Sequence, residues 1–328
     1  NNSMDYRMLA AFGLSFVISV ILYKIFIPIL RKVKLGQKIL EIGPAWHKCK
    51  EGTPVLGGLF FIAPMIVVVV IFLFSENLGE NDYGLLAVFG MALAFGLIGF
   101  IDDYVKLFKK RNKGLSATQK LVLQFLVAAV YLWINSSYCG KDSSLYLPIG
   151  DRSIDLGVFY YFAAIIVIVY MVNCSNLTDG IDGLLGTISV IIGIFFFLIS
   201  FMMPENNSGI LTASLVGALI GFLIFNLHPA KIIMGDTGAL YLGGFLVGMA
   251  FYFNMEVLIF IIMFVWLIEG VSDILQVGYY KLTKKRIFKM APIHHHFEMC
   301  GWSEFKIVTV FSVITAFMCG AAYFIYIM

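Results

Sequence analysis

Apolar residues gather in long runs along almost the whole chain, and polar residues fill the segments between them. A helix that crosses a bilayer needs about 20 mostly apolar residues, with a range of about 17–25. Ten runs have this length, near residues 8–30, 55–74, 84–101, 121–137, 156–172, 184–203, 210–226, 238–254, 255–276 and 306–327. They predict ten transmembrane helices with both termini on one side. The eighth and ninth runs meet at a tight turn over Phe253, Asn254, Met255 and Glu256.

One segment between the runs has a different pattern. Residues 144–148 and 154–156 resemble two short strands, and the residues between them, Ile149 to Ser153, have the composition of a turn. We expect a small β-hairpin here, with a plain linker as the alternative. The predicted fold is therefore an all-α polytopic membrane protein with one small hairpin, forming a single integral-membrane domain over residues 1–328.

Composition excludes a soluble protein. Hydrophobic residues make up 60% of the chain and charged residues 13%, whereas soluble domains have roughly 45–50% apolar and about 25% charged residues. The five cysteines show neither metal-site spacing nor a paired framework. The net charge of +3 and the absence of one continuous basic face give no reason to expect nucleic acid as a partner.

The distribution of basic residues predicts the orientation. Of the 23 Lys and Arg residues, 19 lie in the loops after the first, third, seventh and ninth runs. Basic residues close to transmembrane helices are retained in the cytoplasm. These loops are therefore expected on the cytoplasmic side, and both termini and the hairpin on the outer side.

The first two cytoplasmic loops suggest phosphate chemistry. Lys50 precedes a Gly57-Gly58 pair, where backbone amides and an ammonium group could bind an anion, although such glycines commonly form only a turn. Asp102 and Asp103 end the third run and are followed by Lys106. Adjacent carboxylates with a lysine suit a magnesium–diphosphate site; a solvated helix end is the alternative.

The next two loops are rich in Asn, Asp and Gly. The loop after the fifth run has no Lys or Arg and contains the polar residues Asn173, Asn176, Asp179 and Asp182. Its spacing resembles part of an EF-hand but lacks the terminal Glu, so calcium sensing is not expected. The loop before the eighth run ends in Gly-Asp-Thr-Gly around Asp236, which offers free amides and a carboxylate together. Asp236 as a simple helix N-cap is the alternative.

The last cytoplasmic loop carries three consecutive histidines, His294, His295 and His296. Three adjacent side chains cannot all face one metal in regular secondary structure, so phosphate contact or proton transfer is favoured over zinc ligation. Within the ninth run, Glu269 and Asp273 lie four residues apart on one helical face. Acidic residues inside a membrane are expected to face a cavity or pair with a cation. All the polar clusters fall on the predicted cytoplasmic side.

Five motifs together resemble a known family. They are GTPVLGG at 52–58, DDYVK at 102–106, NLTDGIDG at 176–183, NLHPAKIIMGDTG at 226–238 and APIHHHFE at 291–298. In this order, and over nearly the whole chain, they resemble the MraY family of phospho-MurNAc-pentapeptide translocases, within the polyprenyl-phosphate N-acetylhexosamine-1-phosphate transferase superfamily. The histidine motif is the most specific and indicates the muramyl branch.

The resemblance implies a reaction and a location. The reaction is transfer of phospho-MurNAc-pentapeptide from UDP-MurNAc-pentapeptide to undecaprenyl phosphate in peptidoglycan synthesis, which gives lipid I and UMP and requires Mg²⁺. The implied location is the bacterial inner membrane, multi-pass, with the active site facing the cytoplasm, and a homodimer is plausible.

The resemblance also implies roles for individual residues. Asp236 corresponds to the family's magnesium ligand. The implied catalytic residues are Asp102, Asp103, Asp179, Asp236 and His295. The implied substrate-binding residues are Lys50, Lys106, Lys120, Asn173, Asn176, Asp182, Asn226, Gly235, His294 and His296. Ile233 stands where some relatives carry Phe, which leaves a uracil-stacking residue at this position in doubt.

Two alternative functions are kept. One is a related transferase that uses UDP-GlcNAc, which substrate competition would distinguish. The other is a secondary transporter, whose ionisable residues should cluster near the middle of the bilayer; only Glu269 and Asp273 approach that pattern. Within the transferase reaction, a one-step route and a two-step route through an aspartyl-phosphate intermediate both remain open.

Overall fold

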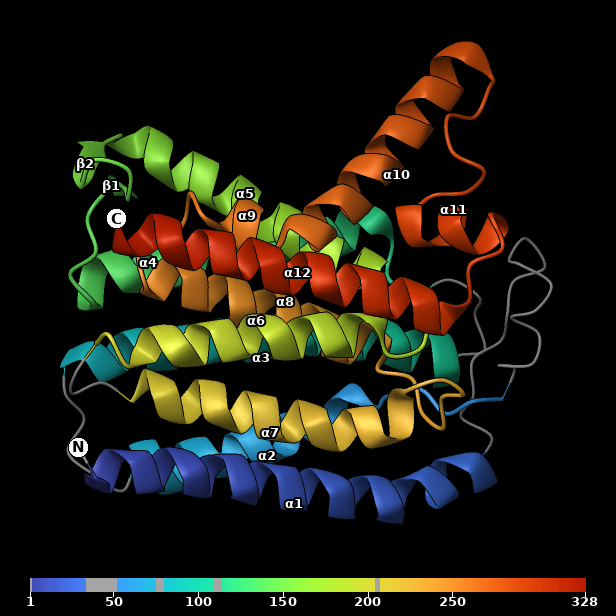
Figure 1. The fold of residues 1–328 in the computed structure, drawn as a ribbon, viewed down its shortest axis with the longest axis horizontal. Helices are drawn as coiled ribbons and strands as arrows, with labels where there is room; N and C mark the ends of the chain where they lie inside the picture. The colour runs from blue at the N-terminus through green and yellow to red at the C-terminus, as the bar shows by residue number, and fades with distance from the viewer. Residues whose placement is uncertain (1, 34–51, 75–79, 109–113, 204–206) are drawn as a thin grey trace.

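The computed structural model describes residues 2–33, 52–74, 80–108, 114–203 and 207–328. It is almost entirely helical (Figure 1). The helices are α1 (Asn2–Lys32), α2 (Gly58–Val68), α3 (Glu80–Phe108), α4 (Ala117–Tyr138), α5 (Val158–Thr178), α6 (Leu184–Ser200), α7 (Ser208–Asn226), α8 (Gly235–Tyr252), α9 (Ile259–Ile262), α10 (Phe264–Thr283), α11 (Ile293–Met299) and α12 (Glu304–Ile327). A short π-helix, η2 (Val69–Leu73), continues α2.

Every apolar run in the sequence is largely helical. Among the described helices, six are long and apolar enough to cross a membrane, namely α1, α3, α4, α5, α7 and α12, and α2 with η2 and α6 are shorter apolar helices. The protein is thus a polytopic membrane protein, while the count of ten crossings stays a prediction. The run at 255–276 proves to be two helices, because the chain breaks at Met263 between α9 and α10.

The long helices lie side by side with α8 in the interior (Figure 1). Residues from Thr237 to Phe251 of α8 are all buried, and α8 packs against α2, α3, α5 and α6. Both termini lie at the same end of the bundle, as expected for an even number of crossings (Figure 1). At the opposite end, α10 leans away from the bundle and leads back to it through α11.

Small residues bring α1 and α7 into close contact. The hydroxyl of Ser15 donates to the carbonyl of Ser214 at 2.7 Å, and the hydroxyl of Ser19 donates to the carbonyl of Ala218 at 2.9 Å. A Cβ at Gly217 would lie 2.3 Å from the carbonyl oxygen of Phe12. Glycine and serine at such positions let helix backbones approach and hydrogen bond where no water is available.

The predicted hairpin is present. Strands β1 (Ser144–Leu147) and β2 (Arg152–Asp155) are antiparallel, with Ser144 opposite Asp155. The hydroxyl of Ser143 and the backbone N–H of Gly157 donate to the Asp155 carboxylate, and these hydrogen bonds lower the pKa of Asp155. The hairpin lies at the end of the bundle that holds the two termini (Figure 1).

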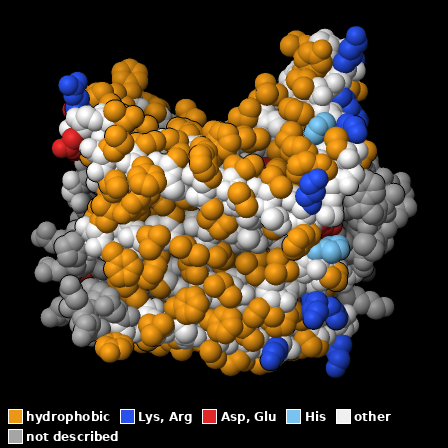
Figure 2. All heavy atoms as spheres, viewed as in Figure 1, with side chains coloured by type: hydrophobic (Ala, Val, Ile, Leu, Met, Phe, Trp, Pro, Cys, Tyr) orange, Lys and Arg blue, Asp and Glu red, His pale blue; other side chains and the backbone are white. Residues whose placement is uncertain are grey.

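The surface is divided by polarity. Figure 2 shows hydrophobic side chains covering the middle of the bundle, whereas most of the visible Lys and Arg side chains lie at the end opposite the termini. An apolar belt of this kind suits contact with lipid. The basic side chains thus mark the end of the bundle opposite the termini.

Candidate active site

The site is built where the C-terminal half of α3 meets the N-terminus of α8. A Cβ at Gly99 would lie 2.1 Å from the carbonyl oxygen of Asp236, so only glycine permits this approach. The backbone N–H groups of Gly57 and Gly58 donate to the carbonyls of Ile233 and Met234, each at 2.9 Å. The GTPVLGG and MGDTG motifs are therefore neighbours, and α8 begins in a fixed place beside α3.

Asp103 anchors the first turn of α8. Its carboxylate accepts hydrogen bonds from the backbone N–H of Asp236 (3.2 Å), the backbone N–H of Thr237 (2.9 Å) and the hydroxyl of Thr237 (2.7 Å). Asp103 is buried. It does from another helix what an N-cap side chain normally does, namely satisfy the first free amides and place negative charge at the positive end of the helix dipole.

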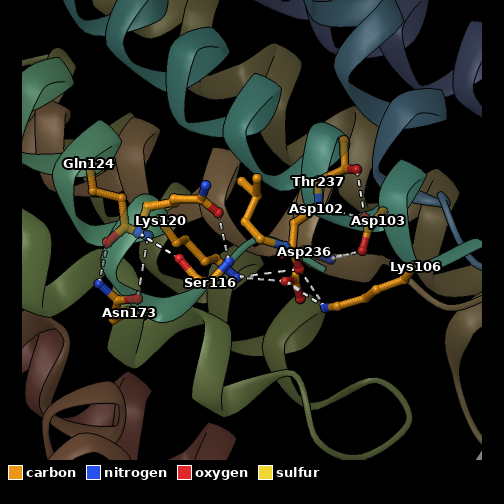
Figure 3. A network of polar contacts seen from close by, with 11 residues as sticks. Asp102, Asp103, Lys106, Ser116, Lys120, Gln124, Asn173, Asp236 and Thr237 are labelled. Carbon is orange, nitrogen blue, oxygen red and sulfur yellow. Dashed lines mark hydrogen bonds and ion pairs between the residues drawn. The ribbon is translucent and has the colours of Figure 1, made fainter. Parts of the chain in front are cut away.

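The carboxylate of Asp236 consequently faces a second set of groups. Its Oδ2 lies 2.6 Å from Nζ of Lys120 and 3.1 Å from Nζ of Lys106, as Figure 3 shows. Lys106 also lies 2.5 Å from Oδ2 of Asp102. The alternative that Asp236 is only an N-cap is not supported. The N-cap position of α8 is occupied by Met234, and Asp236 lies in the first turn of the helix.

The charges around Asp236 determine its protonation. Burial raises the pKa of Asp236, but a hydrogen bond with Asp102 and the ammonium groups of Lys120 and Lys106 outweigh burial and hold the pKa well below its usual range. Asp236 lies before the predicted span at 238–254, and its low pKa keeps it an anion at neutral pH. The ammonium groups of Lys106 and Lys120 offset the negative charge of the acidic cluster, and Lys106 is more exposed than Lys120.

The same cluster offers a set of oxygen ligands. One carboxylate oxygen each from Asp102, Asp103 and Asp236 lie within 4.8 Å of one another. Carboxylate oxygens are the ligands that Mg²⁺ prefers, and Mg²⁺ commonly uses one or two of them. Asp103 accepts three hydrogen bonds from the first turn of α8, whereas Asp102 and Asp236 share the ammonium groups of Lys106 and Lys120.

The start of α4 is locked to α3, which places Lys120. Ser116 and Gln119 form a capping box at the N-terminus of α4, and the backbone N–H of Leu115 donates to Oδ1 of Asp102 at 2.8 Å. One turn after Lys120, Gln124 pairs with Asn173 of α5, whose Nδ2 donates to Oε1 of Gln124 at 2.6 Å (Figure 3).

Asn173 was expected to bind substrate. In this structure its amide joins α5 to α4 through Gln124, and Nδ2 also donates to the carbonyl of Val169, one turn earlier in α5, at 2.8 Å. Sequence reasoning did not identify Gln124, its partner. A buried glutamine in an otherwise apolar helix was the available signal.

The polar turn after α5 is tied to the neighbouring loops. Oδ2 of Asp182 lies 3.1 Å from Nδ1 of His228 and accepts from the backbone N–H of Ala230 at 3.0 Å. Asn226 accepts from the backbone N–H of Gly183 at 3.0 Å and donates to the carbonyl of Ile232 at 2.9 Å. Asp182 and Asn226, both predicted site residues, thus hold two loops together.

Asp182 of this turn also belongs to a second possible metal group, with His228 after α7 and Glu304 at the start of α12. One ligand atom each from Asp182, His228 and Glu304 lie within 4.8 Å of one another. Asn176 is in the last turn of α5, and Asp179 follows it as the C-cap residue. Gly235, also a predicted site residue, begins α8 at a positive φ of 75°, which glycine adopts without strain.

The three histidines lie on α11 and have different partners. Nδ1 of His294 lies 3.0 Å from Oε2 of Glu269, and Nδ1 of His295 lies 2.5 Å from Oε2 of Glu298. His296 accepts from the backbone N–H of Lys289 at 3.1 Å. Each imidazole ring is therefore oriented by its own hydrogen-bond partner. The apolar pattern did not predict α11, because this helix is short and partly polar.

The structure brings Lys106 and Lys120 to Asp236 and places His294, His295 and His296 on α11. Lys50, the remaining predicted cation, lies outside the described residues. Thr237 and Gln124 are polar residues that the sequence analysis did not single out. Glu269, which the sequence predicts to face a cavity or pair with a cation, contacts His294.

Comparison with known proteins first gives the class. Residues 85–254 match the model of glycosyl transferase family 4. This stretch runs from α3 to the turn after α8 and includes Asp102, Asp103 and Asp236. A polytopic membrane protein whose polar site falls inside that match is a membrane transferase of glycosyl transferase family 4.

Full-length relatives then narrow the class. The phospho-N-acetylmuramoyl-pentapeptide-transferase of Caldicellulosiruptor bescii is 42% identical over 316 residues, 96% of each chain. Proteins of the same name from Clostridium perfringens (42% over 320 residues, 98% of this chain and 97% of theirs) and Oceanobacillus iheyensis (41% over 308 residues, 94% of each) are similar. The chain belongs to the phospho-N-acetylmuramoyl-pentapeptide-transferase family, and it is a multi-pass bacterial membrane protein.

Proposed function

We propose that the protein transfers phospho-MurNAc-pentapeptide from UDP-MurNAc-pentapeptide to undecaprenyl phosphate, forming lipid I and releasing UMP in peptidoglycan synthesis. The observation that carries this proposal is the cluster of Asp102, Asp236, Lys106 and Lys120 within a chain that is 42% identical to pentapeptide transferases over nearly its full length. Phosphoryl transfer needs neutralised charge and a fixed geometry more than it needs covalent chemistry from the protein.

We propose Asp236 and Asp102 as the residues that would hold a magnesium ion. The carboxylate oxygens of both residues suit this ion. The ammonium groups of Lys106 and Lys120 lie beside them and can move to phosphate oxygens when a divalent cation binds. When bound, Mg²⁺ would supply positive charge to the diphosphate oxygens of the nucleotide. Asp103 would act differently from its expected catalytic role, by holding the turn that presents Asp236.

The residues of this chain have separate tasks in the proposed reaction. Lys106 and Lys120 neutralise charge on the departing UMP and on the transferred phosphoryl group. The attacking lipid phosphate has a second pKa of about 6 and is largely a dianion at neutral pH, so a strong general base is not required. Both the one-step route and the route through an aspartyl phosphate are compatible with these tasks.

The end of the bundle that contains this cluster is proposed to face the cytoplasm. Most of the Lys and Arg side chains visible in Figure 2 lie at that end, as the positive-inside rule requires. The hairpin and both termini would then lie outside. UDP-linked substrates are made in the cytoplasm, so this orientation gives them direct access to the site.

The test is UMP release by the purified protein from UDP-MurNAc-pentapeptide, with and without undecaprenyl phosphate. We expect release that requires the lipid and is abolished in Asp236→Asn. Asp151→Asn is the matched control, because Asp151 is a carboxylate in the hairpin turn at the opposite end of the bundle. Turnover with UDP-GlcNAc instead would reassign the substrate, and full activity of Asp236→Asn would overturn the site.

A further inference from the structure

Glu269 is a carboxylate in the second turn of α10 with no exposed surface. A buried carboxylate in a membrane protein is costly unless a partner compensates it. Its partner is His294 of α11, which is also fully buried. Nδ1 of His294 lies 3.0 Å from Oε2 of Glu269, and the backbone N–H of His294 donates to the same oxygen at 3.4 Å. Glu269 therefore binds both the ring and the backbone of His294.

The far side of the imidazole ring touches the polar turn after α5. A Cβ at Gly180 would lie 2.0 Å from Nε2 of His294, so the ring rests directly against the backbone of this turn. Nε2 is buried and has no hydrogen-bond partner among the residues that the structure describes. Its contact with the turn is thus one of shape, and Glu269 supplies the one hydrogen bond recorded for the ring among the described residues.

The turn in question carries predicted site residues. Asp179 precedes Gly180, and Asp182 follows it by two residues. Beside Glu269 on α10, Gly270 packs on α5 so closely that a Cβ there would lie 2.3 Å from Sγ of Cys174. Glu269 is therefore fixed relative to α5, and through His294 it also contacts the turn where α5 ends.

We propose that Glu269 is a positioning residue that holds His294 against Gly180 and thereby sets the place of the Asp179–Asp182 turn at the active site. This inference rests on the proposed transferase function and assigns Glu269 no contact with substrate. Removal of the Glu269 carboxylate leaves Nδ1 of His294 buried with a weaker hydrogen-bond partner or none. A buried polar group that has lost its partner is destabilised, so the ring shifts or water enters beside it. The ring then no longer supports the turn.

Asp273 provides a matched control. It lies four residues after Glu269 on the same helix and is partly exposed, and no hydrogen bond or ion pair is recorded for it among the described residues. Asp273→Asn makes the same chemical change as Glu269→Gln, from carboxylate to amide, on the same helix. Glu269→Gln keeps the side-chain volume, so a large cavity is not created.

The first experiment does not depend on activity. Hydrogen–deuterium exchange of the full-length protein in detergent is compared for wild type, Glu269→Gln and Asp273→Asn. We expect faster exchange in Glu269→Gln confined to residues 176–183 and 293–299, with helix α7 as the internal reference. Unchanged exchange at 176–183, or an equal increase in Asp273→Asn, overturns the inference.

The second experiment is a double-mutant cycle on kcat/KM for UMP release. We expect Glu269→Gln to lower kcat/KM by about tenfold, as for other outer partners that orient a histidine. The double variant with His294→Asn should be no slower than His294→Asn alone, within about twofold, because Glu269 acts through His294. If the double variant is slower than His294→Asn by the same factor that separates Glu269→Gln from wild type, the inference is overturned. Absence of turnover in the wild type instead rejects the proposed function, and the exchange experiment still decides the role of Glu269.

Discussion

Replacing Gly99 with alanine should disable the site without changing any of its polar side chains. The added Cβ would lie 2.1 Å from the carbonyl oxygen of Asp236, 2.4 Å from its carbonyl carbon and 2.6 Å from the backbone nitrogen of Thr237. All three atoms belong to backbone and cannot rotate away. Because real Cβ atoms essentially never approach closer than 3.0 Å, α3 and α8 must separate by about 0.9 Å or more.

The size of the effect follows from this displacement. Forcing extra volume into a packed contact costs typically about 1–3 kcal/mol, which lowers stability without unfolding the protein. A shift of about 1 Å at a reacting group can cost roughly 100-fold in rate. The shift in Gly99→Ala falls directly on Asp236 and on the amides that Asp103 binds. We therefore expect kcat to fall by about 100-fold while the melting temperature falls only moderately.

Gly90 of the same helix is the control. A Cβ at Gly90 would have no atom within 4 Å, so Gly90→Ala should leave UMP release unchanged and stabilise α3, since alanine favours helix over glycine by about 1 kcal/mol. The assay is UMP release with saturating substrates, with melting followed by intrinsic fluorescence. Gly99→Ala with activity within threefold of Gly90→Ala would refute the claim that this contact positions Asp236.

Three further outcomes are expected. Asp103→Asn should lower the melting temperature and UMP release together, because the amide turns a donor toward the N–H groups of Asp236 and Thr237, at a cost of about 1–3 kcal/mol; normal melting would contradict this. Gly217→Ala should lower the melting temperature by several degrees whereas Gly13→Ala should not, since only the first Cβ meets backbone; equal melting curves would argue against the α1–α7 contact. Excess EDTA should stop UMP release and added Mg²⁺ should restore it, because carboxylate oxygens at the site suit that ion; release that persists in EDTA would rule out the metal.

Much of the fold was predictable because the membrane imposes a simple rule on sequence. Nine of the ten apolar runs each form one helical segment, and the hairpin between α4 and α5 lies where turn residues separate two short strands. The break at Met263 was not predictable from hydrophobicity, since the residues on both sides are apolar. Hydropathy reports which residues avoid water, and it does not report where a helix bends inside lipid.

The sequence singles out Asp102, Asp103, Lys106, Lys120 and Asp236, which lie together in the structure, but it does not show which group each side chain contacts. Asp102 and Asp103 are adjacent in sequence, yet one faces Lys106 while the other binds the start of α8, more than 130 residues away. Glu269 and Asp273 share a helical face, yet only Glu269 is buried. These differences arise from which helices are neighbours in space, and local spacing along one helix carries no information about that.

The complete burial of α8 has a consequence for how the protein enters the membrane. α8 is not among the described helices that are long and apolar enough to cross a bilayer by their own composition, and its first turn carries Asp236. A segment of this kind partitions poorly into lipid when it leaves the translocon alone. The helices that surround it, α2, α3, α5 and α6, all come earlier in the chain. They are therefore already in the membrane when α8 is synthesised, and they offer it a protein environment in which its glycines and its carboxylate are accommodated. The order of the helices along the chain thus favours insertion of α8 into the membrane.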